Sequence, residues 1–284
     1  MESCWPTCKV GAGFYKCSNH VVRLMNISRK SFLQLGLAIA ALGAIGVAPA
    51  VADEEADAFI RSMEDRTRAE TNTATYRMVV TRPGESDREV VMQSWDDRIG
   101  DRSFIHILAP RRDKDTTFLK VEGNLWMYLP NLERDIKIPP AMMLNSWMGS
   151  DFTNDDLVNQ SSAINDYDNT IIAREVGADG VEVVTIQGVA HLDAPVVWGR
   201  VVMQLRTDGI PISQQFYDED DVLIRSLIFS DLKDMGGRLA PGKMEMIPET
   251  EPGHKTVMYI DAMTFDEPIS DDIFTRANLS RRAR

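Results

Sequence analysis

Hydrophobic positions divide the chain into an apolar leader, one helical segment and a long series of short strands. Between Asp53 and about Ala69, Phe59 and Met63 lie one helical turn apart and carboxylates fill the opening turn, which predicts a helix. From Asn72 onward, short runs rich in β-branched and aromatic residues alternate with turn residues, as strands do. The predicted strands are Tyr76–Thr81, Glu89–Trp95, Arg102–Leu108, Thr116–Val121, Leu125–Leu129, Arg134–Ile138, Ile171–Val176, Val181–Gln187, Arg200–Arg206, Pro211–Tyr217, Leu223–Phe229, Lys243–Ile247 and Thr256–Phe265. Because short turns join most of them, we expect an antiparallel meander that curls into a barrel or splits into two sheets.

The leader has the pattern of a secretory signal peptide. A thirteen-residue apolar run, Leu35 to Val47, follows the basic pair Arg29-Lys30, and the small residues after it end at Ala52. A membrane anchor, the alternative, needs about 20 apolar residues. We therefore expect residues 1–52 to comprise an upstream extension and a signal peptide that starts at Met25 and is cleaved after Ala52. The sequence leaves open whether export uses the Sec or the twin-arginine route.

Charge and cysteine content narrow the class of protein. The formal net charge is -12, and it becomes -16 without the leader, which holds five basic residues and one acidic residue. Nucleic acid is not an expected partner, because phosphate binding needs a basic surface. All three cysteines, Cys4, Cys8 and Cys17, precede Met25, so the mature chain has no disulfide and no thiol nucleophile. We expect no cofactor and no metal site.

Several predicted strands are apolar on both faces. Val90-Val91-Met92 and Leu227-Ile228-Phe229 show this pattern, whereas an antiparallel sheet with one wet face should alternate. Either helices cover one face, or the concave side lines a cavity. Thirteen of the fifteen methionines follow the leader. Methionine suits apolar surfaces that bind varied shapes, although ordinary core filling explains its abundance equally well.

The segment from 121 to 158 carries the most distinctive pattern. Pro139-Pro140 ends a strand, because proline donates no hydrogen bond to a sheet. A predicted short helix, ended by Gly149, then gathers large apolar side chains: Met142, Met143, Trp147 and Met148. This inserted helix is either a lid over an open barrel end or part of the plain core. The proline pair and Gly149 suit the hinges of a lid, and they serve equally as passive stops.

The strings Leu125–Pro130 and Ser146–Leu157 resemble the outer-membrane lipoprotein-sorting family of LolA-like periplasmic carriers. The resemblance extends more diffusely from about Glu54 to Leu279. It implies a mainly β fold in which residues 53–284 form a single domain, a half-open antiparallel β-barrel with an N-terminal helix and a short inserted lid helix. It also implies a monomeric periplasmic carrier that binds a lipid or the acyl chains of a lipoprotein. Such a carrier takes its cargo from an inner-membrane transporter, of ABC or resistance-nodulation-division type, toward the outer membrane.

A carrier of this kind needs an apolar groove and no catalytic residue, since an acyl chain gains about 0.8 kcal/mol per buried methylene. The side chains expected to bind lipid belong to three strands and the predicted lid: Met78, Met92, Trp126, Tyr128, Met142, Met143, Trp147 and Met148. Strand phase decides the strand assignments, because a one-residue slip turns each side chain to the other face. We also expect glutamates at positions 147 and 148 to abolish capture of cargo and to leave the fold intact.

Two other classes of function compete with the carrier. An enzyme needs a catalytic motif, yet His106, His191 and His254 lie in no HExxH or HxH arrangement, and no GxSxG string accompanies them. The acidic stretches lie in turns, where solvated charge explains them. The second class is a periplasmic lipid-sensing or accessory protein of a resistance-nodulation-division type exporter, which would bind its ligand in the same barrel.

Overall fold

The computed structural model describes residues 53–158, 163–177, 179–194 and 196–281, which form thirteen strands and three α-helices. The predicted signal peptide, its cleavage site and the three cysteines lie outside the described residues. The strands are β1 (Thr71–Thr81), β2 (Arg88–Asp97), β3 (Arg102–Ala109), β4 (Thr117–Val121), β5 (Asn124–Leu129), β6 (Arg134–Lys137), β7 (Tyr167–Val176), β8 (Glu182–Ala190), β9 (Arg200–Arg206), β10 (Pro211–Tyr217), β11 (Leu223–Met235), β12 (Arg238–Pro248) and β13 (Lys255–Phe265). Each predicted strand has its counterpart, so the expectation of a mainly β fold is confirmed.

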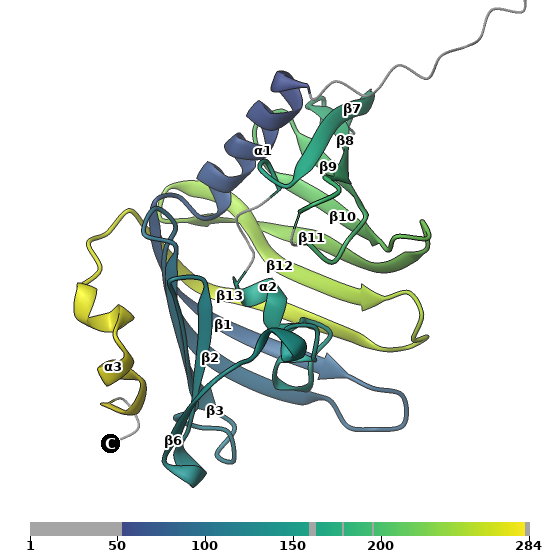
Figure 1. Ribbon diagram of the computed structural model, residues 1–284. Coiled ribbons are helices and arrows are strands. Elements are labelled where there is room, and N and C mark those ends of the chain that lie inside the picture. Colours follow the sequence, from purple (N-terminus) through teal and green to yellow (C-terminus); the bar gives the residue numbers. More distant parts are fainter. Residues whose placement is uncertain (1–52, 159–162, 178, 195, 282–284) are drawn as a thin grey trace, which may run out of the picture. The chain divides into compact units, whose positions relative to one another are not determined.

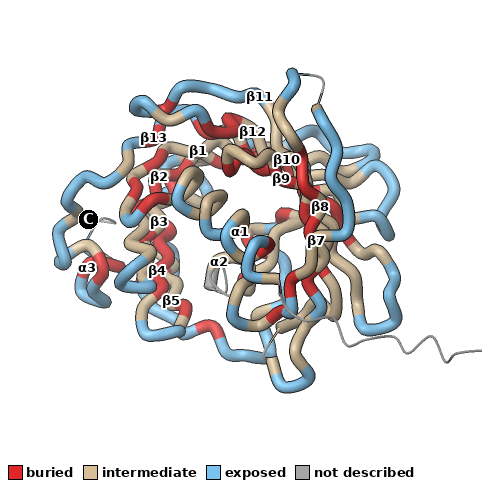
Figure 2. The backbone as a smooth tube through the Cα atoms, turned by 90° about the horizontal axis from the view of Figure 1, so that it is seen from above, coloured by how far each residue is buried: buried red, intermediate tan, exposed pale blue. Residues whose placement is uncertain are grey.

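Two meanders meet at the centre of a single antiparallel sheet. The strand order is β6-β5-β4-β3-β2-β1-β13-β12-β11-β10-β9-β8-β7, so within β1 to β6 and within β7 to β13 each strand pairs with its neighbour in the chain, and β1 pairs with β13. The two edges are β6 and β7, and the sheet is not closed. Figure 2 shows the strands curving around α1 and α2. The half-open antiparallel barrel expected from the sequence is therefore confirmed.

The connection from β6 to β7 has to cross the open side of the sheet. These two strands follow one another in the chain but lie at opposite edges. The connection holds two 3-10 turns, η2 (Pro140–Met142) and η3 (Trp147–Gly149), and the helix α2 (Asn154–Val158). Figure 1 shows α2 on the concave side of the curved sheet. The strand order thus places the short inserted helix in the mouth of the half-open barrel.

The inserted helix differs in position from the one predicted over residues 142–149. Ser146 and Thr153 form an isolated antiparallel bridge, and the Trp147 amide donates to the Phe152 carbonyl over 2.7 Å. This tight loop is incompatible with a continuous helix, and Met148 takes a left-handed conformation with φ 53°. The α-helical turn begins only at Asn154, where the Thr153 amide donates to Asp156 Oδ2 over 2.7 Å.

Two further helices pack on opposite faces of the sheet. The helix α1 (Glu54–Thr67) is capped by Asp53, whose carboxylate accepts from the Glu55 amide over 3.0 Å. The turn η4 (Asp271–Phe274) and the helix α3 (Arg276–Arg281) lie outside the curve of the sheet (Figure 1). Among the described residues, no helix is long and apolar enough to cross a membrane.

The core on the concave face is divided into separate clusters. Under the β6–β7 connection, Trp147 packs with Phe118 and the concave side chains of β1 to β5. Under α1, Ala56 and Ile60 pack with the concave side chains of β7 to β9. One end of the concave face is therefore packed against the β6–β7 connection and the other end against α1. The candidate site lies between these two clusters.

Candidate ligand-binding cavity

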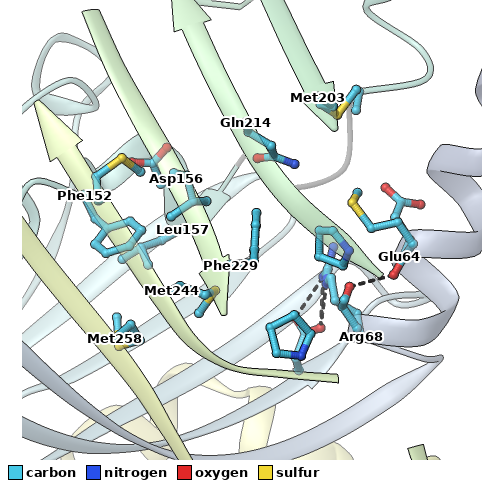
Figure 3. A pocket seen from close by; sticks show the side chains of 18 of the residues that line it. Glu64, Arg68, Phe152, Asp156, Leu157, Met203, Gln214, Phe229, Met244 and Met258 are labelled. Carbon is cyan, nitrogen blue, oxygen red and sulfur yellow. Dashed lines mark hydrogen bonds and ion pairs between the residues drawn. The ribbon is translucent and has the colours of Figure 1, made fainter. Parts of the chain in front are cut away.

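A cavity of about 430 Å³ lies on the concave face of the sheet, between α1 and the β6–β7 connection (Figure 3). This volume lies within the range of about 300–1,000 Å³ that is typical of small-molecule sites. Its walls are mainly apolar. Seven methionines line it: Met63, Met92, Met203, Met244, Met246, Met258 and Met263.

Strand alternation builds the apolar wall. On β11, Leu227 and Phe229 line the cavity, while Ile228 between them is 40% exposed on the other face. On β12, Met244 and Met246 follow the same alternation. The strands that are apolar on both faces therefore have one row of side chains in the cavity, which explains their poor alternation in the sequence.

Polar side chains gather where α1 meets β1 and β2. The Arg68 guanidinium forms an ion pair with Asp96 on β2, with Nη2 at 2.9 and 3.1 Å from the two carboxylate oxygens. The Asn72 side-chain amide donates to the same carboxylate over 3.2 Å and to the Arg68 carbonyl over 3.1 Å. Arg68 and Asp96 thus satisfy one another at one corner of an otherwise apolar cavity.

Glu64 lies one helical turn before Arg68 and lacks such a partner (Figure 3). Its side chain is 15% exposed, and its Oε2 lies 3.8 Å from Arg98 Nη1, which is longer than a hydrogen bond. No described residue donates a hydrogen bond to this carboxylate. Burial raises the pKa of Glu64, although Arg68 and Arg98 act in the opposite direction. Nearby, burial and the charge of Asp96 raise the pKa of Tyr76 to about 12, so this phenol stays neutral.

At the other end of the cavity, Asp156 of α2 pairs with Arg225 of β11. Two hydrogen bonds of 2.5 and 2.8 Å join the carboxylate and the guanidinium. Arg225 also stacks against two rings, with its Cζ 4.5 Å from the centroid of Trp198 and 4.6 Å from that of Phe216. This buried pair ties the inserted helix to the far side of the cavity.

The connection is also fastened to the near side. Asp151 pairs with Arg82 over 2.9 Å and accepts a hydrogen bond of 2.7 Å from the Thr256 hydroxyl. The Arg88 guanidinium donates to the Met148 carbonyl. Polar contacts to both halves of the sheet therefore hold the β6–β7 connection in place.

Three buried polar atoms around the cavity have no hydrogen-bond partner among the described residues. They are the donors Trp147 Nε1 and Arg225 Nε and the acceptor Asn169 Oδ1. Trp147 and Asn169 themselves line the cavity. Unsatisfied polar groups are rare in protein interiors, so these atoms indicate a site that holds polar as well as apolar groups.

The structure brings together only part of the side chains predicted to bind lipid. Met92 and Trp147 line the cavity. Three others belong to the neighbouring core cluster or pack against it: Met78, Met143 and Met148. Met142 is 44% exposed. The methionines of the connection thus pack beside the cavity or face outward.

Trp126 and Tyr128 lie on the opposite face of the sheet. They pack with Phe274 and Leu279 of the C-terminal segment, and Arg276 stacks on the Trp126 ring at 3.9 Å. The neighbouring side chains of β5, Leu125 and Met127, face the cluster under the connection instead. The assumed phase of this strand differs by one residue from that in the structure, and neither aromatic side chain lines the cavity.

Trp147 is also a core residue, which changes the expected effect of a charge there. It is 1% exposed and packs edge-on against Phe118, with ring centroids 5.5 Å apart. A glutamate at 147 would bury a carboxylate in an apolar cluster. We therefore no longer expect the fold to remain intact in the variant with glutamates at 147 and 148.

Sequence reasoning missed most of the cavity wall. Met203, Phe229, Met244 and Met258 face the cavity from the second meander (Figure 3). Apolar residues on both faces of Leu227–Phe229 were the available signal. The sequence carried no signal for the polar corner formed by Glu64, Arg68 and Asp96, because Glu64 lies in an ordinary amphipathic helical pattern.

Comparisons with known proteins agree with this architecture. The family whose sequence model matches residues 100–281, more than half of the chain, is described as "Uncharacterized protein". The chain belongs to this family. No curated protein matches it.

Three solved structures share the fold of this family member. A DUF1329 family protein from Desulfovibrio piger has a TM-score of 0.72 at 21% identity, over 81% of this chain and 99% of the other. A domain named for outer-membrane lipoprotein sorting, from Vibrio parahaemolyticus, has a TM-score of 0.68 at 22% identity, over 80% and 99%. A LolA superfamily protein from Nitrosomonas europaea has a TM-score of 0.65 at 16% identity, over 78% and 98%. The resemblance expected from the sequence is therefore confirmed at the level of the fold.

Proposed function

We propose that this protein is a periplasmic carrier that binds a lipid, or the acyl chains of a lipoprotein, in the cavity. One observation carries the proposal: an open, curved sheet holds a methionine-lined cavity of about 430 Å³ on its concave face. Burial of apolar surface suffices for such binding, at about 0.8 kcal/mol per methylene, so no catalytic step is part of the proposal. The LolA-like fold supports the same function.

In this proposal the carrier comprises residues 53–284 and acts as a monomer after cleavage following Ala52. It receives its cargo from an inner-membrane transporter of ABC or resistance-nodulation-division type and moves it toward the outer membrane. The leader pattern and the family resemblance support these steps. An accessory role beside an exporter would use the same cavity with a different partner.

The first test is native mass spectrometry, combined with lipid extraction, on protein purified from the periplasm. We expect a polypeptide that begins at Asp53 and carries an extractable lipid or an acylated protein. A polypeptide that retains the leader would contradict export. An empty protein that also fails to bind an apolar probe would contradict the carrier.

A pair of variants tests whether the cavity is where binding occurs. Phe229→Glu places a carboxylate in the apolar wall, and Ile228→Glu places the same group on the other face of the same strand. We expect the first to weaken binding of the neutral fluorophore N-phenyl-1-naphthylamine by at least about tenfold, because a buried charge is unfavourable. Ile228→Glu should bind as the parent does. Equal effects of the two variants would exclude this cavity as the site.

A further inference from the structure

The charged groups of the cavity are unevenly balanced. Four carboxylates line it, from Glu64, Asp96, Asp155 and Asp156, and Arg68 is the one guanidinium among the described lining residues. Arg68 is paired with Asp96, Arg225 beside the lining is paired with Asp156, and Arg98 faces Glu64 over 3.8 Å. An anionic ligand would therefore meet more carboxylates than guanidinium groups, and each of these guanidinium groups already faces a carboxylate.

Glu64 presents an acceptor that lacks a donor. Its carboxylate faces the cavity from α1, is 15% exposed and lies 3.8 Å from Arg98, its nearest cation. Asn169 Oδ1, fully buried in the cavity wall, is a second acceptor that receives no hydrogen bond from a described residue. A fully buried acceptor without a donor, such as Asn169 Oδ1, is unfavourable. Asn169 Nδ2 donates to Asp57 in the first turns of α1 and Glu64 lies near the end of that helix, so a ligand with donors along the α1 side of the cavity would supply what both acceptors lack.

The apolar wall lies next to this polar corner. Figure 3 shows Glu64 and Arg68 at one side, with Phe229, Met244 and Met258 toward the other. The two unpaired donors, Trp147 Nε1 and Arg225 Nε, belong to the opposite end of the cavity, at the connection and β11. The arrangement fits a molecule with a small polar head at α1 and an apolar body along the methionines.

We propose that the cavity selects its ligand by head group, accepting an uncharged or cationic amphiphile whose hydroxyl or amine donates to Glu64 and rejecting an anionic one. This inference rests on the proposed carrier function and specifies the chemical class of its cargo. It separates alcohols, amines and glycosylated lipids from free fatty acids and from lipids with an exposed phosphate.

Competition on the exported protein tests the proposal. N-phenyl-1-naphthylamine is bound first, and decylamine, decanol and decanoate, which share one chain length, are then compared at neutral pH as competitors. We expect the amine and the alcohol to displace the probe at concentrations at least about tenfold lower than the carboxylate. A carboxylate that competes as well as the amine would overturn the proposal. Failure of the probe to bind saturably would overturn the carrier function itself, and this inference with it.

Two matched variants locate the selectivity. Glu64→Gln keeps the shape and removes the charge, so we expect the tenfold advantage of decylamine over decanoate to shrink. Glu54→Gln makes the same change at an exposed position of the same helix and should preserve the order of the three competitors. A ratio of decylamine to decanoate that is the same in Glu64→Gln and in the parent would show that Glu64 does not select the head group. The parent measurement stands whether or not a variant folds.

Discussion

Glu64 combines a role in the proposed site with a cost to the folded state. A carboxylate that is 15% exposed and accepts no hydrogen bond from the described residues loses hydration that the protein does not replace. Burial accordingly raises its pKa above the ordinary value of 4.5. Groups that oppose folding in this way are concentrated at functional sites, because selection keeps them for binding.

The raised pKa gives a pH-dependent prediction for Glu64→Gln. The folded chain binds this proton more tightly than the unfolded chain, so the free energy of unfolding falls as the pH rises from about 4.5 through the raised pKa. We expect Glu64→Gln to raise the free energy of unfolding at pH 7 by about 0.5–1 kcal/mol, and by less at acid pH. Urea denaturation at both pH values measures this, with Glu54→Gln as the control. A loss of stability at neutral pH would show that Arg98 and Arg68 outweigh the burial.

At the scale of elements, the β6–β7 connection is held between two halves of the sheet. Arg82 and Thr256 bind it at Asp151, and Arg225 binds it at Asp156. The sequence could not reveal these pairings, because the partners lie about 70 to 105 residues apart. It did predict where a cover would be inserted, since the proline pair and the apolar cluster mark an interruption between strands.

The Asp156–Arg225 pair should control the order of α2. The Arg225 side chain is 6% exposed, so Asp156→Asn leaves a nearly buried charge unpaired. We expect a loss of about 3 kcal/mol and faster amide exchange confined to residues 140–158. Asp221→Asn breaks the Arg200–Asp221 pair, in which the carboxylate is 69% exposed, and should cost less than about 1 kcal/mol. Exchange that accelerates equally in the central strands would mean that α2 does not open separately.

Strands and their faces were predictable to different degrees. All thirteen strands follow from β-branched runs and turn residues, but the outer halves of β11 and β12 were missed. The segment from Ser230 to Asp234 is exposed or half-buried along its length, so it carries no hydrophobic alternation. On β5, alternation was visible and its phase was not, because large apolar residues lie on both faces. Trp126 and Tyr128 are covered by η4 and α3, which pack on the convex face from the far end of the chain.

At the scale of the whole molecule, the cavity is a consequence of how the core is divided. The cavity lies between the cluster under α1 and the cluster under the connection, and Ile260 and Met263 of a third, smaller cluster line it between them. This division of the core depends on contacts between the first meander, β1 to β6, and the second, β7 to β13. The sequence therefore predicted an apolar concave face but could not place the cavity or its polar corner.

A ligand that fills this space should stabilise the entire domain. Binding to the folded state alone adds about 2.7 kcal/mol at a hundredfold excess over Kd, which for a chain of this size corresponds to a rise in Tm of about 5–10 °C. We expect decanol to produce such a rise in the parent protein, measured by calorimetry, and a much smaller rise in Phe229→Glu. A rise of equal size in both would place the bound decanol outside the cavity.

The open sheet has one more consequence, for self-association. Its two edges, β6 and β7, leave backbone donors and acceptors unpaired by another strand, and such edges can pair with a second copy of the chain. β6 is only four residues long, is exposed throughout and carries Arg134, Asp135 and Lys137. The outer part of β7 is likewise exposed and carries Arg174 and Glu175. Charged, short or exposed edges of this kind oppose edge-to-edge stacking, so a half-open barrel can stay open at high concentration without forming fibres.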